Sequence, residues 1–166
     1  IEQIKQSFKN LIVTIVGDIA HSRVARSTAH GLSIMGVKEL RFVSPQEFAP
    51  QKNITPDAKH YTDLHKGLED ADVVMALRIQ HERINDTSNM NLEEYIQNYR
   101  LTEKNMNIAA PNAIVMHPGP MNRDIEIESS LADSKQSVIL RQVANGVAVR
   151  MSLLSELAKN YGTENE

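Results

Sequence analysis

The sequence predicts one α/β domain over residues 1–166, with a doubly wound, mostly parallel, Rossmann-like sheet flanked by helices. Three observations predict this class. Short β-branched apolar runs recur along the chain, helical patterns separate them, and 166 residues suffice for one hydrophobic core. Because the runs are apolar at consecutive positions, both of their faces should be buried, as in a parallel sheet with helices on either side.

Apolar runs define the expected strands. Four runs rich in Val, Ile, Leu and Phe are interpreted as strands, at residues 11–16, 40–43, 72–77 and 113–116. Residues 59–62, with the sequence Lys-His-Tyr-Thr, are a further candidate. Five strands of this length are typical of a small open sheet.

Helical periodicity defines two segments between these runs. From His21 to Met35, apolar or small residues recur at helical spacing, and Gly36 follows as the expected C-terminal cap. Asn91 precedes a second helical segment that ends at Tyr99, with Glu94 three positions after Asn91. That spacing is the pattern of a capped helix start.

Two further helices are expected at the ends of the chain. Apolar residues at near-fourfold spacing predict a long C-terminal helix over 138–160. Gly146 interrupts this helix at a cost of about 1 kcal/mol relative to Ala. Residues 1–9 are interpreted as a lead-in helix that joins an upstream domain.

Composition excludes several classes of function. The 18 Lys and Arg residues against 21 Asp and Glu give a formal net charge of −3, which leaves no broad basic surface for nucleic acid. No apolar run approaches the roughly 20 residues that cross a bilayer, so no membrane partner is expected. The chain has no Cys, which excludes disulfides and thiolate metal ligands and suits a cytoplasmic protein. Without a clustered set of metal ligands, we expect neither a metal nor a cofactor.

Ligands of open parallel sheets bind beyond the carboxyl ends of the strands, and the first such end carries Gly17 and Asp18. The Gly-x-Gly-x-x-Gly pattern that lets a backbone approach a pyrophosphate is absent, which disfavours a dinucleotide site. Arg23 lies in the first turn of the helix that follows, near the positive end of its dipole, and is a candidate anion ligand. The alternative is a solvated helix arginine.

Two other strand ends carry groups that suit a carboxylate and an amide. Arg78 and Gln80 follow the run 72–77, and in extended backbone their side chains point the same way. The planar fork of Arg78 matches a carboxylate, and Gln80 adds a neutral donor or acceptor. The run 113–116 leads into His117-Pro118-Gly119-Pro120, a rigid turn whose carbonyls can accept hydrogen bonds from an NH₂ group. A plain loop turn is the alternative reading of that segment.

Taken together, two arginines, one glutamine and a group of carbonyls describe a site for a small dianion that bears amines. The sequence shows no nucleophile paired with a base at any of the three strand ends. We therefore expect catalysis by orientation and electrostatics rather than through a covalent intermediate.

Four segments carry a resemblance to a known family. They are VGDIAHSRVARS at 16–27, LRIQHER at 77–83, HPGPMNRDIEI at 117–127 and QVANGVAVR at 142–150. In this order and spacing they resemble the second, aspartate-binding domain of the aspartate carbamoyltransferases, over nearly the whole chain.

The resemblance implies a role for each candidate residue. Arg23 and Arg78 would hold the two carboxylates of L-aspartate, and Gln80 would help to orient its amine side. Backbone groups of Pro118, Gly119 and Pro120 would meet the amide end of carbamoyl phosphate. No catalytic residue is expected within this half of the enzyme.

The resemblance also implies an activity. The family transfers a carbamoyl group from carbamoyl phosphate to the amine of L-aspartate, giving N-carbamoyl-L-aspartate and phosphate in pyrimidine biosynthesis. Ornithine carbamoyltransferase shares the fold but has His-Cys-Leu-Pro where this chain has residues 117–120, so aspartate is the expected substrate. The Ser-x-Arg-Thr-Arg and His-Pro-x-Gln motifs of the family's first domain are absent, and we expect the 166-residue chain to be inactive by itself.

Partners follow from the same resemblance. It implies a carbamoyl phosphate domain upstream of residues 1–9 and neighbouring catalytic subunits in a trimer, and it admits regulatory or dihydroorotase chains. We expect the polar segment 81–91 to close over aspartate when both substrates are bound. The alternative function is a stand-alone, non-catalytic module that binds aspartate or regulates another protein.

Overall fold

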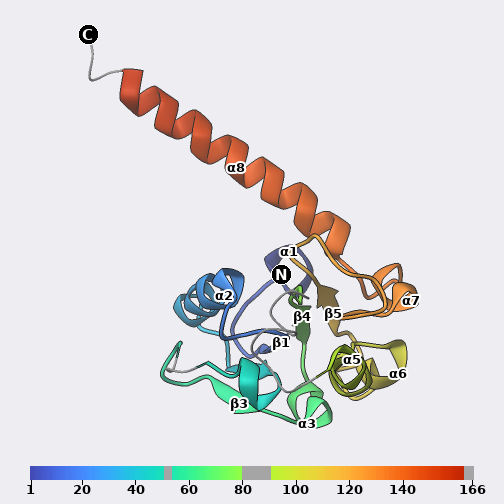
Figure 1. The fold of residues 1–166 in the computed structure, drawn as a ribbon. Coiled ribbons are helices and arrows are strands. Elements are labelled where there is room, and N and C mark those ends of the chain that lie inside the picture. The colour runs from blue at the N-terminus through green and yellow to red at the C-terminus, as the bar shows by residue number, and fades with distance from the viewer. Residues whose placement is uncertain (51–53, 80–90, 163–166) are drawn as a thin grey trace.

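Five strands form one sheet in which every neighbouring pair is parallel (Figure 1). They are β1 (Ile12–Val16), β2 (Glu39–Val43), β3 (Lys59–Tyr61), β4 (Val73–Ala76) and β5 (Ile114–Met116), in the order β3-β2-β1-β4-β5. The computed structural model describes residues 1–50, 54–79 and 91–162. The predicted fold class is confirmed, and each strand begins and ends within one residue of its expected bounds.

The sheet is covered on both faces because successive side chains of a strand point in opposite directions. Val13 and Ile15 of β1 belong to one buried apolar cluster, whereas Val16 belongs to another. Helix α2 (Arg23–Ile34) covers the first cluster with its buried residues Ala25, Ala29 and Leu32. Helices that follow β3 cover the other cluster, which explains why the strand runs are apolar at consecutive positions.

The remaining helices are α1 (Glu2–Lys5), the 3₁₀ turn η1 (Gln46–Phe48), α3 (Leu64–Leu68), α5 (Leu92–Tyr99), α6 (Glu103–Met106), α7 (Ser129–Ala132) and α8 (Ile139–Gly162). Some of the remaining helices start at a side-chain cap, as α3 does at Asp63 and α6 at Thr102. The helix expected over residues 1–9 is confined to α1, because Gln6 has a φ of 63°, a left-handed conformation that a helix cannot continue.

Side-chain caps account for the start of α2 and α5. Ser22 Oγ accepts a hydrogen bond from the N–H of Ala25 at 3.0 Å, so α2 begins at Arg23 rather than at the expected residue 21. Asn91 Oδ1 accepts one from the N–H of Glu94 at 2.7 Å, as the spacing predicted. Gly36 follows the C-terminal end of α2 with a φ of +73°, the conformation typical of a glycine cap.

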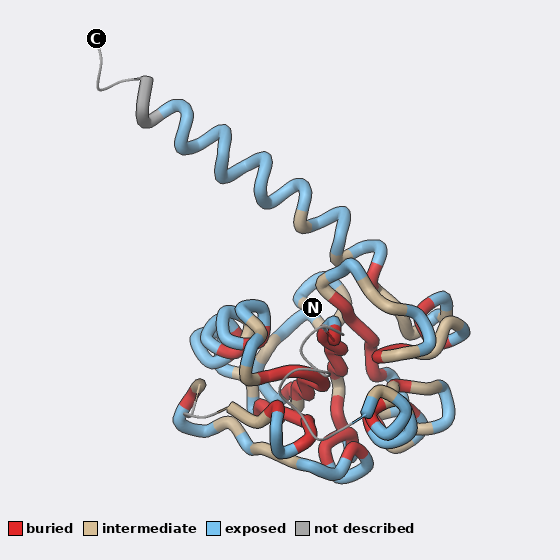
Figure 2. The backbone as a smooth tube through the Cα atoms, viewed as in Figure 1, coloured by how far each residue is buried: buried red, intermediate tan, exposed pale blue. Residues whose placement is uncertain are grey.

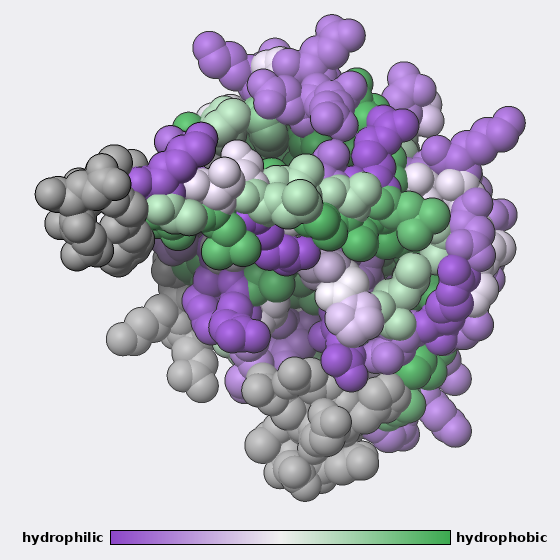
Figure 3. All heavy atoms as spheres, turned by 90° about the horizontal axis from the view of Figure 1, so that it is seen from above, coloured by the Kyte–Doolittle hydropathy of each residue, from purple (hydrophilic) through white to green (hydrophobic). Residues whose placement is uncertain are grey.

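Helix α8 leaves the body of the domain as a projecting rod (Figure 1), and almost all of its described residues are exposed (Figure 2). Its apolar side chains are exposed as well, among them Leu140 at 84%, Met151 at 66% and Leu154 at 67%. Helical spacing places these three on one face, with Val143 and Val147 between them. Seen from above, apolar residues form a band across the molecule along this helix (Figure 3). Within the described parts of the chain, most of that face is left uncovered.

Packing between α3 and β2 gives a first testable prediction. A Cβ at Gly67 would lie 2.1 Å from Cγ2 of the buried Val43, far inside van der Waals contact. Gly67→Ala should therefore lower the free energy of unfolding by about 1–3 kcal/mol, because the β-branched Val43 has little freedom to move away. Urea unfolding followed by circular dichroism measures the change.

Gly31→Ala in α2 is the matched control. Apart from its chain neighbours and the backbone of its own helix, no atom lies within 4 Å of the position its Cβ would take, and its φ is not positive. The substitution should raise stability by about 0.5–1 kcal/mol through helix propensity alone. Equal effects at the two glycines would contradict the close contact between α3 and β2.

No helix in the described ranges 1–50, 54–79 and 91–162 is both long enough and apolar enough to cross a membrane.

Candidate functional site

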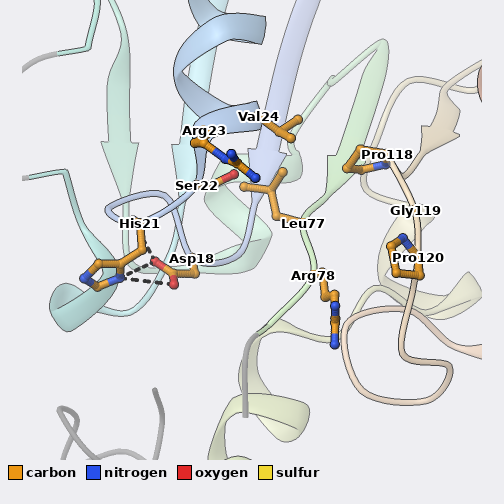
Figure 4. Close-up of a pocket in the computed structure, with 10 residues that line it drawn as sticks. All are labelled: Asp18, His21, Ser22, Arg23, Val24, Leu77, Arg78, Pro118, Gly119 and Pro120. Atoms are coloured by element: carbon orange, nitrogen blue, oxygen red, sulfur yellow. Dashed lines mark hydrogen bonds and ion pairs between the residues drawn. The ribbon is translucent and has the colours of Figure 1, made fainter. Parts of the chain in front are cut away.

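A cavity of about 220 Å³ opens at the carboxyl ends of β1, β4 and β5 (Figure 4). It is lined by Asp18, His21, Ser22, Arg23, Val24, Leu77, Arg78, Pro118, Gly119 and Pro120. Five of the six residues singled out from the sequence thus come together at one place, and the sixth, Gln80, lies outside the described residues. Most of the segment 81–91, which was expected to close over the ligand, lies outside them too.

Sheet topology explains this convergence. The chain runs from β1 outward to β2 and β3, then returns to place β4 on the other side of β1. At such a switch point the connections leave in opposite directions and open a crevice at the carboxyl end of the strands. The segments that follow β1 and β4 therefore form neighbouring walls of one cavity, with the segment after β5 beside them.

Gly17 lets these walls approach each other closely. It has a φ of +131°, and a Cβ there would lie 3.0 Å from Cβ and 3.1 Å from the carbonyl oxygen of Leu77. A side chain at this position would push β1 away from the segment that carries Arg78. The glycine at the end of the first strand thus serves a close approach between protein segments rather than an approach to a phosphate group.

Two cationic side chains face the cavity. Arg23 enters from the first turn of α2 and Arg78 from the segment after β4, with the 118–120 turn on the far side of Arg78 (Figure 4). Both residues are exposed, and neither side chain has an ion-pair partner among the residues that the structure describes. An open cavity with two unneutralised guanidinium groups is suited to a ligand with two negative charges.

Asp18 brings a carboxylate to the same cavity, but this carboxylate is already hydrogen bonded to His21. Asp18 is only 5% exposed, and its Oδ1 accepts hydrogen bonds from the backbone N–H of His21 at 3.1 Å and from Nδ1 of that ring at 2.9 Å. Sequence reasoning did not single out either residue. The sequence feature that could have identified Asp18 is the Gly-Asp pair at the end of β1, which also resembles the start of a nucleotide-binding loop.

The 118–120 turn lines the cavity with backbone carbonyls that have no partner in the described chain. Pro118 and Pro120 have no N–H, and the N–H of Gly119 donates to Nδ1 of His117 at 2.9 Å. The carbonyls of these three residues accept no hydrogen bond from the described part of the chain. Gly119 has a φ of +69° and the chain bends there, as the Pro-Gly-Pro sequence predicted. The Gly119–Pro120 peptide is cis.

Tyr95 of α5 is buried beneath this region, within electrostatic reach of Asp18 and Glu126. Burial, together with those two carboxylates, raises the pKa of its phenol well above the ordinary range. The hydroxyl stays protonated at neutral pH and cannot act as a base there. Tyr95 stacks on Tyr99 with ring centroids 5.4 Å apart, which accounts for its place in the core.

Within residues 1–50, 54–79 and 91–162, no group of three or more His, Asp or Glu side chains is placed to hold a metal ion. The chemistry that the described cavity offers is the binding and orientation of a charged ligand by arginines and backbone carbonyls.

Comparison with known proteins points to one family. Residues 9–157 match the family model of the aspartate/ornithine carbamoyltransferase Asp/Orn-binding domain. Over 159 residues, or 95% of this chain, the sequence is 47% identical to the aspartate carbamoyltransferase catalytic subunit of Ruthia magnifica subsp. Calyptogena magnifica, of which it covers 49%. The chain therefore spans about half the length of that relative.

Solved structures agree on the fold. The catalytic subunit of M. jannaschii aspartate transcarbamoylase superposes with a TM-score of 0.78 at 25% identity, over 96% of this chain and 54% of that one. Ornithine carbamoyltransferase from Pyrococcus furiosus superposes with a TM-score of 0.81 at 19% identity, over 93% of this chain and 51% of that one.

Proposed function

We propose that this chain, which belongs to the aspartate/ornithine carbamoyltransferase family and matches its Asp/Orn-binding domain, is the L-aspartate-binding half of an aspartate carbamoyltransferase. The complete protein would transfer a carbamoyl group from carbamoyl phosphate to the amine of L-aspartate, giving N-carbamoyl-L-aspartate and phosphate in pyrimidine biosynthesis. One observation carries the proposal: two arginines without acidic partners among the described residues face a cavity beside a turn that offers acceptors.

Each group in the cavity has a proposed role. Arg23 and Arg78 bind the two carboxylates of L-aspartate, each through paired N–H donors. Gln80, which lies outside the described residues, would orient the amine side of that substrate. The carbonyls of the 118–120 turn accept hydrogen bonds from the NH₂ group of carbamoyl phosphate, which fits their lack of partners within the described chain.

The proposed reaction needs no group of this chain to form a covalent bond. The lone pair of the aspartate amine attacks the carbamoyl carbon, the bond from that carbon to the phosphate oxygen breaks, and phosphate leaves with its electron pair. The amine loses a proton in the process, and the departing phosphate takes it up. The role of the aspartate-binding domain is to hold the amine in line with the carbamoyl carbon. Such orientation by itself can lower the activation barrier by several kcal/mol.

Two features favour aspartate over ornithine as the acceptor. The side chain of ornithine ends in an ammonium group, which a pair of arginines would repel, whereas aspartate ends in a carboxylate. The 47% identical relative is an aspartate carbamoyltransferase, and the turn at 117–120 is His-Pro-Gly-Pro. The similarity to the ornithine enzyme, at 19% identity, supports the fold alone.

A larger assembly is part of the proposal. Residues 1–166 would form the aspartate-binding domain, with residues 1–9 leading in from a carbamoyl phosphate domain that corresponds to the other half of the relatives' length. The exposed apolar face of α8 supports a further covering element in that protein. We further propose a cytoplasmic location, which the lack of Cys suits, and a homotrimer of complete chains.

Acceptor specificity tests this function. The complete protein, given carbamoyl phosphate, should carbamoylate L-aspartate. Its kcat/KM for L-ornithine should be lower by a factor of about one hundred or more, because the arginines repel the ammonium group. A colorimetric assay that reads both carbamoyl-aspartate and citrulline measures the ratio. Preference for ornithine would refute the assigned substrate, and failure to use either amine would refute the assigned activity.

A further inference from the structure

His117 follows β5 directly, and its side chain is completely buried. Its two ring nitrogens have different partners. Nδ1 accepts the hydrogen bond from the N–H of Gly119 at 2.9 Å, so Nδ1 carries no hydrogen. Nε2 therefore holds the ring hydrogen, which it donates to Glu126 Oε1 at 3.2 Å.

Glu126 joins this ring to a second wall of the cavity. It is 1% exposed, and its Oε1 also accepts a hydrogen bond from the N–H of Asn122 at 2.6 Å. Asn122 in turn donates through Nδ2 to the carbonyl oxygen of Ile79 at 3.2 Å, next to Arg78 in the chain. One carboxylate oxygen thus links the 118–120 turn with the segment that follows β4.

Packing alone does not account for a charged group at this position. A buried carboxylate costs free energy unless both oxygens are hydrogen bonded, and Glu126 Oε2 has no partner within the described residues. An apolar side chain of the same volume would fill the space without that cost. What Glu126 alone supplies there is a strong acceptor at Oε1 for two donors, one from each side of the link.

We propose that Glu126 is a positioning residue for the 118–120 turn, an inference that rests on the function proposed above. By accepting the hydrogen of His117 Nε2, Glu126 keeps Nδ1 free to hold the N–H of Gly119. With the hydrogen on Nδ1 instead, two N–H groups would face each other and the turn would move. A shift of about 1 Å at a substrate contact can cost about a hundredfold in rate.

Glu126→Ala in the complete protein removes the acceptor and is the principal test. We expect kcat/KM for carbamoyl phosphate to fall about tenfold or more, the size of effect typical of a lost hydrogen bond to a charged group. Glu126→Gln keeps an oxygen that can accept from both donors and should stay within about threefold of the wild type. Glu128→Ala is the control, because Glu128 is partly exposed and, among the described residues, its carboxylate accepts only from the N–H of Glu103, at 3.2 Å. It should change kcat/KM less than about twofold.

Nitrogen NMR of His117 separates positioning from a loss of packing, because packing changes alone do not move a hydrogen between ring nitrogens. The hydrogen should reside on Nε2 in the wild type and in Glu126→Gln, and be shared between both nitrogens in Glu126→Ala. A hydrogen on Nδ1 in the wild type, or wild-type kinetics in Glu126→Ala, would overturn the inference. If Glu126→Ala does not fold, a hydrogen on Nδ1 in Glu126→Gln overturns it in the same way.

The two proposals fail differently. A wild-type protein that carbamoylates neither aspartate nor ornithine refutes the proposed function, whatever the state of His117. The ring spectrum still decides whether Glu126 sets the hydrogen-bond pattern of the turn. A wild type that turns over aspartate while Glu126→Ala matches it in kcat/KM refutes the positioning role alone.

Discussion

The 166-residue chain by itself is expected to form no carbamoyl-aspartate above the uncatalysed rate. The chain spans 49% of the length of its 47% identical relative, and its cavity offers arginines for an acceptor and carbonyls for an amide. Transfer also needs donors at the departing phosphate, and losing even one such donor typically costs about a hundredfold to a thousandfold in rate. A colorimetric assay on the homogeneous chain, with both substrates at saturating concentration, is the measurement.

Addition of the separately produced other half provides the positive arm of this experiment. Activity should return as the two halves associate, and the concentration needed reports their affinity. Leu154→Glu places a charge on the exposed apolar face of α8 and should weaken that recovery. Ser152→Glu, two positions earlier and on a side of the helix away from the apolar stripe, should not. Turnover by the 166-residue chain alone would show that the division of the site between two halves is wrong.

Arg78→Ala should raise the KM for L-aspartate about tenfold to a hundredfold in the complete protein. A charge-assisted hydrogen-bond pair lost from a binding site costs roughly 1.5–3 kcal/mol, and each 1.4 kcal/mol corresponds to a factor of ten. Arg78→Lys should recover only part of the loss, because an ammonium group cannot reproduce the planar fork of a guanidinium. Steady-state kinetics with aspartate varied, and succinate binding by calorimetry, give the two readouts.

Arg26→Ala is the matched control for that substitution. Arg26 is an exposed arginine one turn along α2 from Arg23, does not line the cavity, and donates through Nη1 to the carbonyl oxygen of Ala20 at 3.1 Å. Its removal should change the aspartate KM less than about threefold. If Arg26→Ala raised this KM as much as Arg78→Ala, general loss of positive charge rather than a specific carboxylate contact would explain both.

Local sequence was sufficient for the five strands and the longer helices, but not for the short helices α3, α6 and α7, and it was sufficient to choose candidate site residues. The run 11–16 is apolar at almost every position, so a buried strand could be recognised from these residues alone, and β1 occupies 12–16. Arg23, Arg78 and Pro118 could be chosen because each follows a strand and parallel strands end at the same edge of a sheet. That rule places residues from distant parts of the chain together without any knowledge of their contacts.

Contacts made across the fold were beyond the sequence. Glu126 is one of 21 acidic residues and nothing in its neighbourhood distinguishes it from a solvated glutamate, yet it is buried against His117. The pairing of Asp18 with His21, three positions apart, depends on how the chain turns after Gly17. Such bonds depend on backbone directions that adjacent residues do not specify, so sequence reasoning passed over them.

By itself, then, the sequence determined the class of fold, the five strands, and which strand ends carry arginines and a proline turn, because hydrophobic periodicity and turn chemistry act within a few residues. Tertiary structure alone decided that β1 pairs with both β2 and β4, and that Glu126 closes on His117. It also decided that most of the apolar face of α8 is left exposed. Strand pairing and side-chain burial join segments that are far apart in the sequence, so no local pattern of residues specifies them.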